Sequence, residues 1–354
     1  MTGAAIDIGT TTIQAQLVNI NTGEVLDSFS ALNDQRTFGA DVMSRISAAQ
    51  NGKLKDLYTA INKQIEGILQ QFINKNNLEK IEKCAVSGNT VMLHLFCNID
   101  PSSMGVAPYK PVFLEERHFL GSDLSLSAKE IFLLPGISAF IGADIAAGLT
   151  EIEIMDNNAN AVDSLFVDIG TNGEIAVWKD SEQKLYCCST AAGSCFEETE
   201  ISYGMTASGF VDAIAMMRKN GEIDETGLLI KEAHGITQKD IRQFQLAKSA
   251  IFSGIKLLCK TAKLDLSNIG RTYIAGSFGE HLNLESAAQT GLLPHEIISK
   301  AVVCGNTSLK GAVKSLVDPK FLQRCRNVIR HANVVDLAHD KYFAAAYEHN
   351  MWFK

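Results

Sequence analysis

Apolar and polar positions alternate along this chain in a pattern that occurs twice. A β-rich apolar run at Ala4–Ile8 leads into a glycine turn and a second run at Ile13–Ile20, which predicts a β-hairpin with the turn at its tip. The same pattern returns at Leu165–Ile169 and Glu174–Trp178. Two hairpins are therefore predicted, one in each half of the chain.

The remaining elements also follow the same order in both halves. Segments 53–74 and 240–262 carry apolar residues at three-to-four spacing, which predicts long amphipathic helices. Each is followed by a strand that ends in a small-residue turn, Cys84–Thr90 in the first half and Tyr273–Gly279 in the second. Because the sequence Asp-Ile-Gly-Thr is identical in the two hairpins, the repetition predicts an α/β fold made by duplication.

The boundary between the halves is predicted in the polar, turn-prone stretch Met155–Asn160. The first domain would cover residues 1–155 and the second 156–354, which agrees with the two domains expected of a chain of 354 residues. The last amphipathic segment, Asp336–Phe353, predicts a helix, and its packing back on the first domain stays open.

Composition and charge exclude several classes of protein. The net charge of −8 and the pI of about 5.5 offer no broad basic surface for nucleic acid or anionic lipid. The start, Met1–Ile6, lacks the basic and long apolar regions of a signal peptide, and the apolar stretch Ile131–Leu149 is interrupted by Pro135 and Asp144. We therefore expect a cytoplasmic protein that does not cross a membrane.

The eight cysteines do not predict a metal cluster or disulfides. No Cys-x-x-Cys occurs, and the one grouping is Cys187, Cys188 and Cys195. Adjacent cysteines on a strand point to opposite faces, so these three do not form a thiolate cage. Buried structural thiols are the favoured interpretation, and no disulfide is expected in a cytoplasmic protein.

The two hairpin turns predict a polyphosphate site. A polyphosphate requires backbone N–H donors that it can approach closely, which favours glycine at Gly9 and Gly170. Hydroxyl groups follow in both turns and supply further donors, at Thr10, Thr11, Thr12 and Thr171. Such a turn is common in ordinary sheets when it occurs alone, but two copies opening two similar halves are a more specific signal.

The aspartates Asp7 and Asp168 precede these turns. A carboxylate repels phosphate, so we expect both to act on Mg²⁺, through water. Competing nucleotide motifs are absent, because neither Gly-x-x-x-x-Gly-Lys-[Ser/Thr] nor Gly-x-Gly-x-x-Gly after a strand occurs. The prediction is a Mg-ATP clamp formed by two hairpins.

Three further small-residue stretches fit the same site. Ile274–Gly279 would let a nucleoside lie over bare backbone, although a helix start with a glycine turn explains it as well. Gly142–Gly148 and Gly305–Ala312 permit close helix packing, as at a hinge between domains or in an ordinary core. Both interpretations stay open.

Together these five elements resemble the superfamily of acetate and sugar kinases, heat-shock chaperones and actin. Its pattern of phosphate 1, connect 1, phosphate 2, adenosine and connect 2 matches Asp7–Thr12, Gly142–Gly148, Asp168–Gly173, Ala275–Gly279 and Gly305–Ala312. The resemblance implies two duplicated ribonuclease H-like domains, as in actin-like ATPases, with the nucleotide in an interdomain cleft.

The resemblance also implies the site residues. The implied catalytic residues are Asp7, Asp144 and Asp168. Those implied to bind the cofactor ATP are Gly9, Thr10, Thr11, Thr12, Gly170, Thr171, Asn172, Gly173, Gly276, Ser277, Phe278, Gly279, Gly305 and Asn306.

Within this superfamily, the residues in and around the motifs resemble those of the ATPase domain of the reductive activators of corrinoid proteins. The matching segments are Ala5–Ile13, Ala31–Ile46, Val86–Thr90, Asp168–Glu174 and Ser189–Glu197. The resemblance implies an ATPase that binds a corrinoid (cobalamin-binding) protein of a methyltransferase system and drives the reduction of Co(II) to Co(I). It also implies a homodimer.

The sequence departs from that family in two ways. The plant-type Cys-x₄-Cys-x₂-Cys pattern of a [2Fe–2S] domain is missing, so the electrons are expected from a separate ferredoxin-like iron–sulfur donor. Glu198 replaces the usual small residue after Phe196-Glu197. Two alternatives remain: a small-molecule kinase of the same fold, with Asp144 or Asp168 as base, and a nucleotide-switched scaffold.

Overall fold

The computed structural model describes residues 1–155, 162–196, 206–231 and 235–353. The chain forms two compact units, Met1–Glu153 with Thr307–Arg330 and Ile154–Asn306 with His331–Lys354. Most of the predicted linker lies outside the described residues, and the domain division at 155/156 stays a prediction. No helix in the described part of the chain is both long and apolar enough to cross a membrane.

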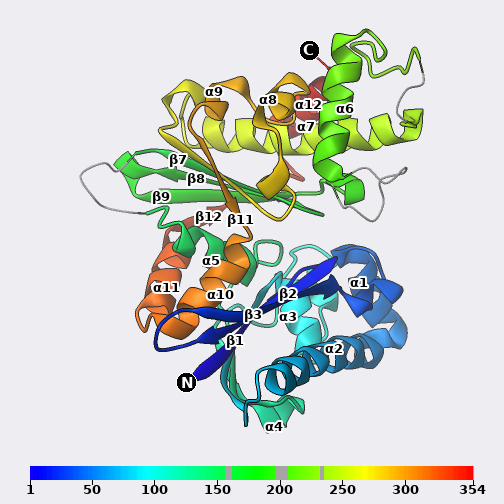
Figure 1. Ribbon diagram of the computed structural model, residues 1–354. Coiled ribbons are helices and arrows are strands. Elements are labelled where there is room, and N and C mark those ends of the chain that lie inside the picture. Colours follow the sequence, from blue (N-terminus) through cyan, green and yellow to red (C-terminus); the bar gives the residue numbers. More distant parts are fainter. Residues whose placement is uncertain (156–161, 197–205, 232–234, 354) are drawn as a thin grey trace. The chain divides into compact units, whose positions relative to one another are not determined.

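The first unit is a sheet with helices packed on it (Figure 1). Its strands are β1 (Thr2–Ile8), β2 (Thr12–Asn19), β3 (Val25–Leu32), β4 (Ile81–Gly88), β5 (Arg117–Leu120) and β6 (Ala128–Leu133). Its helices are α1 (Val42–Ala48), α2 (Leu54–Lys75), α3 (Thr90–Phe96), α4 (Gly121–Leu124), α5 (Ala143–Glu151), α10 (Thr307–Val317) and α11 (Phe321–His331).

The predicted first hairpin forms at the centre of this sheet. Strand β1 pairs antiparallel with β2, from Thr2 opposite Asn19 to Ile8 opposite Ile13. On its other side β1 pairs with β4 in parallel, and the described sheet has the order β3-β2-β1-β4-β6-β5. Because β1 has a strand on each side and is buried over most of its length, it shows the continuous apolar run of a core strand.

The second unit repeats this arrangement. Its strands are β7 (Ser164–Ile169), β8 (Gly173–Lys179), β9 (Lys184–Thr190), β10 (Arg271–Ala275), β11 (Ala301–Gly305) and β12 (Ala332–Val334). Its helices are α6 (Ala207–Lys219), α7 (Gln238–Thr261), α8 (Leu284–Gln289), α9 (His295–Ile298) and α12 (Lys341–Asn350).

The two sheets share one strand order. Five strands follow in the same order in both sheets, because β3-β2-β1-β4-β6 corresponds to β9-β8-β7-β10-β11. The sixth strand differs in position, since β5 lies beside β6 whereas β12 lies beside β9. The pairing of β7 is antiparallel with β8 and parallel with β10, as for β1 with its neighbours. The predicted α/β fold of two duplicated halves is thereby confirmed.

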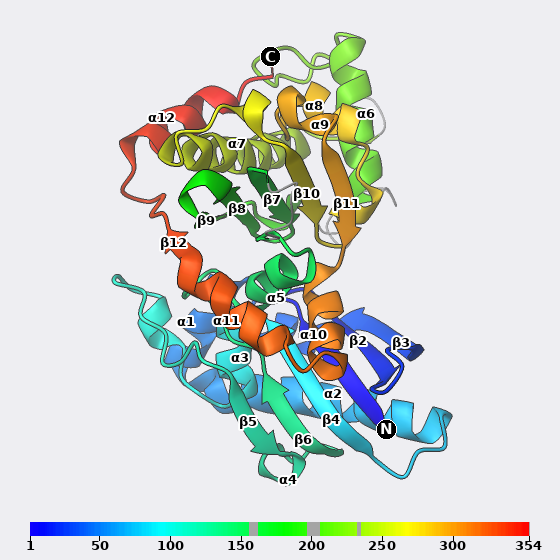
Figure 2. The same cartoon turned by 90° about the vertical axis from the view of Figure 1, so that its left-hand side faces the viewer.

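Two small-residue helices pack closely in the first unit. Helix α10 lies against α5 in both views of the molecule (Figures 1 and 2). A Cβ on Gly311 would lie 2.8 Å from both the Cβ and the carbonyl oxygen of Ala147. These distances are too short for a side chain at position 311 unless one of the two helices moved. The predicted close approach of these stretches is confirmed, while their role as a hinge stays a prediction.

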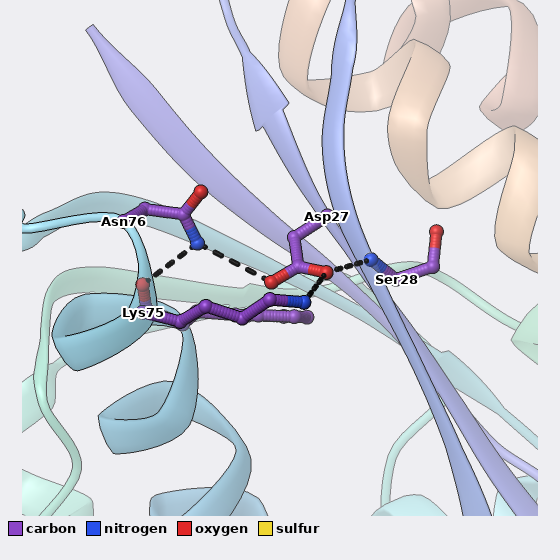
Figure 3. Close-up of polar contacts among 5 residues, drawn as sticks. Asp27, Ser28, Lys75 and Asn76 are labelled. Carbon is purple, nitrogen blue, oxygen red and sulfur yellow. Dashed lines mark hydrogen bonds and ion pairs between the residues drawn. The ribbon is translucent and has the colours of Figure 1, made fainter.

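The edge strand β3 is tied to the end of α2 by a carboxylate (Figure 3). Asp27 accepts hydrogen bonds from Lys75 Nζ at 2.8 Å, from the backbone N–H of Ser28 at 2.9 Å and from Asn76 Nδ2 at 3.3 Å. The hydrogen bond from Lys75 lowers the pKa of this carboxyl below its usual value. The contact anchors β3 far from the predicted phosphate turn.

The C-terminal helix differs from its prediction. It forms over Lys341–Asn350 rather than over the whole of 336–353, because Asp340 caps its start by accepting from the N–H of Phe343 at 2.9 Å. It packs along α7 within the second unit (Figure 2), and a contact with the first half stays a prediction.

Polar side chains of α7 hold the chain that follows this helix. Lys248, only 1% exposed, donates to the carbonyl oxygens of Asn350 at 2.7 Å and Trp352 at 2.8 Å. Gln245 Nε2 donates to the carbonyl oxygen of Met351 at 2.7 Å. A buried lysine thus binds the carbonyl group of the last helical residue, where a positive charge is favourable, and a second carbonyl group just beyond the helix.

We predict that Lys248→Met lowers the free energy of unfolding by about 2 kcal/mol, because two buried carbonyl groups lose a charged donor. Chemical denaturation measures this loss, and limited proteolysis should cut residues 341–353 faster. Lys239→Met on the same helix is the matched control, since Lys239 is exposed. Equal stability of the two variants would contradict the anchoring role.

Candidate functional site

Asp7 lies at the carboxyl end of β1, where the first hairpin turns. Its neighbour across the parallel pair is Ser87 of β4. Ser308, in the first turn of α10, donates to Asp7 Oδ1 at 2.8 Å, and its Oγ lies 2.9 Å from Ser87 Oγ. Both serines are buried, so the carboxylate is held by a hydroxyl network inside the first unit.

A second carboxylate shares this part of the unit. Asp144 stands in the first turn of α5 and accepts from the N–H of Ile145 at 2.8 Å. Burial first, and then the charge of Asp7, raises the pKa of Asp144 to about 7. Two acidic groups are therefore close enough to affect each other's ionisation, as at many functional sites.

Two helix starts meet beside these carboxylates. A Cβ on Gly142, the residue before α5, would lie 2.6 Å from the backbone nitrogen of Thr90 and 2.8 Å from Asp144 Oδ1. Thr90 begins α3, and its Oγ1 donates to the carbonyl oxygen of Ser138 at 2.6 Å. Only glycine fits at position 142, so the first residue of the predicted connect 1 stretch has a packing reason.

The first phosphate turn requires glycine for a local reason. A Cβ on Gly9 would lie 2.4 Å from the carbonyl oxygen of Thr12, closer than any side chain tolerates. Thr10 and Thr11 form the tip and are partly exposed, and Thr12 begins β2. The structure places all four predicted residues of this turn next to Asp7.

The second hairpin has a comparable turn in the other unit. Asp168 lies near the end of β7, and the N–H of Gly170 donates to the carbonyl oxygen of Asn172 at 2.9 Å. Thr171 is partly exposed at the tip and Gly173 begins β8. The four residues predicted to bind phosphate here therefore form one tight turn beside Asp168.

The predicted adenosine loop adjoins this second turn. Gly276 has a φ of +89°, and a Cβ on it would lie 2.6 Å from both Asp168 Oδ1 and the carbonyl oxygen of Ile169. Its N–H donates to the carbonyl oxygen of Gly305 at 3.1 Å, which brings the Gly305-Asn306 segment to the same place. Glycine is needed for both the conformation and the approach.

Not every residue of the predicted adenosine loop is available to a ligand through its side chain. Phe278 is buried and stacks on Phe196 with ring centroids 4.6 Å apart, so its ring belongs to the core. A Cβ on Gly279 would touch Ile274 Cγ2 at 3.0 Å, whereas Ser277 is exposed. The loop presents mainly backbone and one hydroxyl.

Sequence reasoning missed the serines that hold Asp7. Ser87 and Ser308 lie in stretches recognised for other reasons, but neither was expected to contact a carboxylate. The contact between Ser308 and Asp7 joins positions 301 residues apart. Local pattern carries no signal for such a pair.

Comparisons with known proteins assign the chain to a family. Residues 2–157 match the family model described as the RACo middle region. Residues 163–226 and 230–354 match the model described as the C-terminal domain of RACo, the ASKHA domain. The matches cover both units of the fold.

Two curated proteins and one solved structure are similar over nearly all of the chain. It is 30% identical over 422 residues to corrinoid activation enzyme RamQ of Eubacterium limosum, covering 99% of this chain and 70% of that protein. It is 25% identical over 379 residues to the [Co(II) methylated amine-specific corrinoid protein] reductase of Methanosarcina barkeri, covering 87% and 68%. A solved reductive activator for corrinoid, iron-sulfur protein superposes with a TM-score of 0.91 and 28% identity, covering 100% and 66%.

The chain therefore spans about two thirds of the length of these relatives, 70%, 68% and 66%. The matches confirm the resemblance that the motifs indicated and the fold that it implied. The chain belongs to the RACo family, whose middle region and C-terminal ASKHA domain its two halves match.

Proposed function

We propose that this protein is an ATP-dependent activator that binds a corrinoid protein of a methyltransferase system and drives its reductive reactivation. The observation that carries the proposal is the match of both halves to the RACo models, together with relatives named for corrinoid activation and for reduction of a Co(II) corrinoid protein. One electron from a separate iron–sulfur donor would convert Co(II) to Co(I) and leave the donor oxidised by one electron.

ATP has a thermodynamic role in this proposal. Reduction of Co(II) is uphill for ordinary cellular donors, so a second favourable process must be coupled to it. ATP hydrolysis to ADP and phosphate supplies that process without any redox change. Coupling requires that the nucleotide-bound and nucleotide-free states of the activator differ in their affinity for the corrinoid protein.

The nucleotide would be bound by the two hairpin turns and the adenosine loop. Gly9–Thr12 and Gly170–Gly173 offer backbone N–H groups and hydroxyls to the phosphates. The backbone at Gly276–Gly279 and at Gly305-Asn306 would accept the nucleoside. The need for glycine at positions 9 and 276, where a Cβ would clash with backbone, supports these assignments.

The acidic residues fit a magnesium ion. Asp7 and Asp144 bring hard oxygen ligands to one place. Burial and then repulsion from Asp7 raise the pKa of Asp144, and a divalent cation would offset that repulsion. Asp168 would serve the same ion from the second hairpin. Among the described residues no three His, Cys, Asp or Glu side chains form a metal cage, so water and phosphate oxygens would complete the coordination. Bound Mg²⁺ would neutralise charge on the phosphates.

Three further parts of the proposal rest on the family resemblance and on composition. We infer a homodimer, a cytoplasmic location and a division into domains 1–155 and 156–354.

The direct test mixes this protein with a reduced iron–sulfur donor and a purified corrinoid protein in the Co(II) state, taken from a system that contains a RamQ-like activator. Visible spectroscopy follows the oxidation state of the cobalt. We expect the Co(I) spectrum to appear with Mg-ATP at least about 10-fold faster than without it, because a coupling of about 1.4 kcal/mol already gives that factor. Phosphorylation of a small metabolite, with no change in the cobalt spectrum, would instead establish a kinase.

We predict that Asp7→Asn lowers ATP hydrolysis by about 100-fold, because a neutral amide no longer binds the magnesium ion that offsets the phosphate charge. Phosphate release measures the rate. Asp27→Asn is the matched control, since Asp27 is also a hydrogen-bonded aspartate of the first unit but holds β3 on α2. Equal rates in the two variants would remove Asp7 from the site.

We predict that Asp144→Asn flattens the pH dependence of stability in EDTA buffer. The folded protein keeps a proton on Asp144 up to about pH 7, whereas the unfolded chain releases it near 3.8, so rising pH destabilises the wild type across that window. Between about pH 5 and pH 8 the variant should therefore gain about 2 kcal/mol relative to the wild type.

Urea denaturation at several pH values measures this gain. Asp34→Asn is the control, because Asp34 is an exposed aspartate of the same unit. A constant difference between Asp144→Asn and the wild type across the pH range would show that the pKa of Asp144 is not raised in the folded protein.

A further inference from the structure

Three consecutive carbonyl groups of the first phosphate turn are bound from behind. Asn33 Nδ2 donates to the carbonyl oxygen of Gly9 at 2.9 Å, and the backbone N–H of Asn33 donates to that of Thr11 at 2.8 Å. Between them, Arg45 Nη2 donates to the carbonyl oxygen of Thr10 at 2.5 Å. Two residues outside every predicted nucleotide motif thus hold the whole tip of the turn.

Arg45 is itself fixed in place. It is fully buried on α1, and its Nε donates to the carbonyl oxygen of Gly39 at 3.0 Å. Its Nη1 lies 3.4 Å from Gln35 Oε1 and 2.9 Å from Met92 Sδ. The guanidinium group therefore has one geometry, which a flexible surface arginine would not have.

Asn33 is fixed equally well. It is 1% exposed, and its Oδ1 accepts from the N–H of Gln35 at 2.9 Å. That bond assigns Nδ2 as the atom that faces Gly9. Gln35 is buried too and donates through Nε2 to the carbonyl oxygen of Leu57 at 3.0 Å, which joins the pair to α2.

The bound carbonyl groups determine where the N–H groups of the turn point. In a trans peptide the C=O and the following N–H lie on opposite sides of the chain, and the peptide bonds of this turn are trans. Since the carbonyls of Gly9 and Thr10 point toward Asn33 and Arg45, the N–H groups of Thr10 and Thr11 point the other way. A phosphate binds such outward N–H groups.

The charge of Arg45 acts in the same direction. A buried cation directly behind the peptide of Thr10 makes the electrostatic potential at the turn more positive. The effect is stronger than it would be in water, because the buried surroundings have a low dielectric constant. A bound polyphosphate would in turn offset part of the cost of burying the guanidinium. Orientation and charge both favour an anion at the tip.

We propose that Asn33 and Arg45 are positioning residues that set the affinity of the first turn for the phosphates of the nucleotide. The proposal rests on the proposed function, because it assumes that this turn binds ATP. It assigns a role to the segment 31–46, which the phosphate, connect and adenosine motifs leave without one. A merely structural role would stabilise the fold without favouring phosphate.

The experiment compares the dissociation constants of ATP and adenosine for the same variants by calorimetry. Arg45→Met should weaken ATP binding by about 30-fold, since a charged hydrogen bond and its field are lost, and adenosine binding by less than about 2-fold. Arg45→Lys keeps the charge but cannot reach Thr10 and Gly39 together, so an intermediate loss of about 5-fold is expected.

Asn33→Asp is the second variant, chosen because it preserves size and the acceptor for Gln35 N–H. It replaces the donor to Gly9 by a carboxylate oxygen that repels the carbonyl, so ATP should bind about 10-fold more weakly at unchanged adenosine affinity. Arg117→Met is the control, because the Arg117 guanidinium lies 4.1 Å from the Phe113 ring centroid and is bound to Glu115, not to the turn. It should leave the ratio of the two affinities unchanged.

The outcomes separate the two levels of the proposal. Variants that melt at a lower temperature but keep the wild-type ratio of ATP to adenosine affinity would overturn the positioning role and leave the proposed function intact. A wild-type protein that binds no ATP would overturn both. A selective loss for ATP in Arg45→Met and Asn33→Asp, absent in Arg117→Met, supports the positioning role even where stability also falls.

Discussion

The carboxylate of Asp7 is the constraint around which the first unit is arranged. It stands at the end of a core strand, where a charge without hydrogen bonds would be costly. Ser308 Oγ donates to Asp7 Oδ1 at 2.8 Å, and Ser87 Oγ lies beside that hydroxyl group. The first of these comes from α10, a helix that follows β11 of the second unit in sequence but belongs to the first unit. The close packing of α10 on α5, at Gly311 and Ala147, brings that hydroxyl to the carboxylate.

The same backbone constraint appears in both halves, but the side chains differ. A Cβ on Gly88 would lie 2.8 Å from the carbonyl oxygen of Ile8, and one on Gly276 would lie 2.6 Å from that of Ile169. Gly88 ends β4 and Gly276 directly follows β10, the strands that run parallel to β1 and β7, so duplication preserved a close backbone approach. Beside the aspartates, however, Asp7 has a serine as its register partner, whereas Asp168 has Ala275. The register partner of the aspartate therefore carries a hydroxyl group in the first half and a methyl group in the second.

This difference is consistent with different roles for the two halves of the proposed site, one for a cation and one for the nucleoside. In the first half there is a second carboxylate, Asp144, whose pKa is raised to about 7 by burial first and then by the charge of Asp7. In the second half, the carboxylate of Asp168 lies against the bare backbone of Gly276. Paired carboxylates suit a cation, and bare backbone suits the flat surface of a nucleoside.

Much of the fold was predictable because its signals are local. The hairpin turns, α2 and α7 follow from residue patterns within a few positions, and their ends agree with the prediction within two residues. The contacts that orient the site are not local: Asn33 reaches Gly9 across 24 positions and Arg45 reaches Thr10 across 35. The packing of the Phe278 ring on Phe196 could not be predicted either, because these residues lie far apart in the sequence; binding of a nucleoside by the backbone of this loop stays a prediction.

The rigidity of the first turn bears on how ATP could drive an uphill reduction. A flexible loop that orders only when phosphate binds loses part of the binding free energy to its own ordering. Asn33 and Arg45 order the tip in advance through buried side chains, so less of the free energy of phosphate binding is lost in this way. More of it then remains to distinguish one conformational state of the protein from another, and coupling depends on that difference in affinity rather than on tight binding alone. A preorganised phosphate turn therefore suits the proposed ATP-driven activator, since an activator that bound ATP equally well in every state could not drive the reduction of its partner, however tightly it bound.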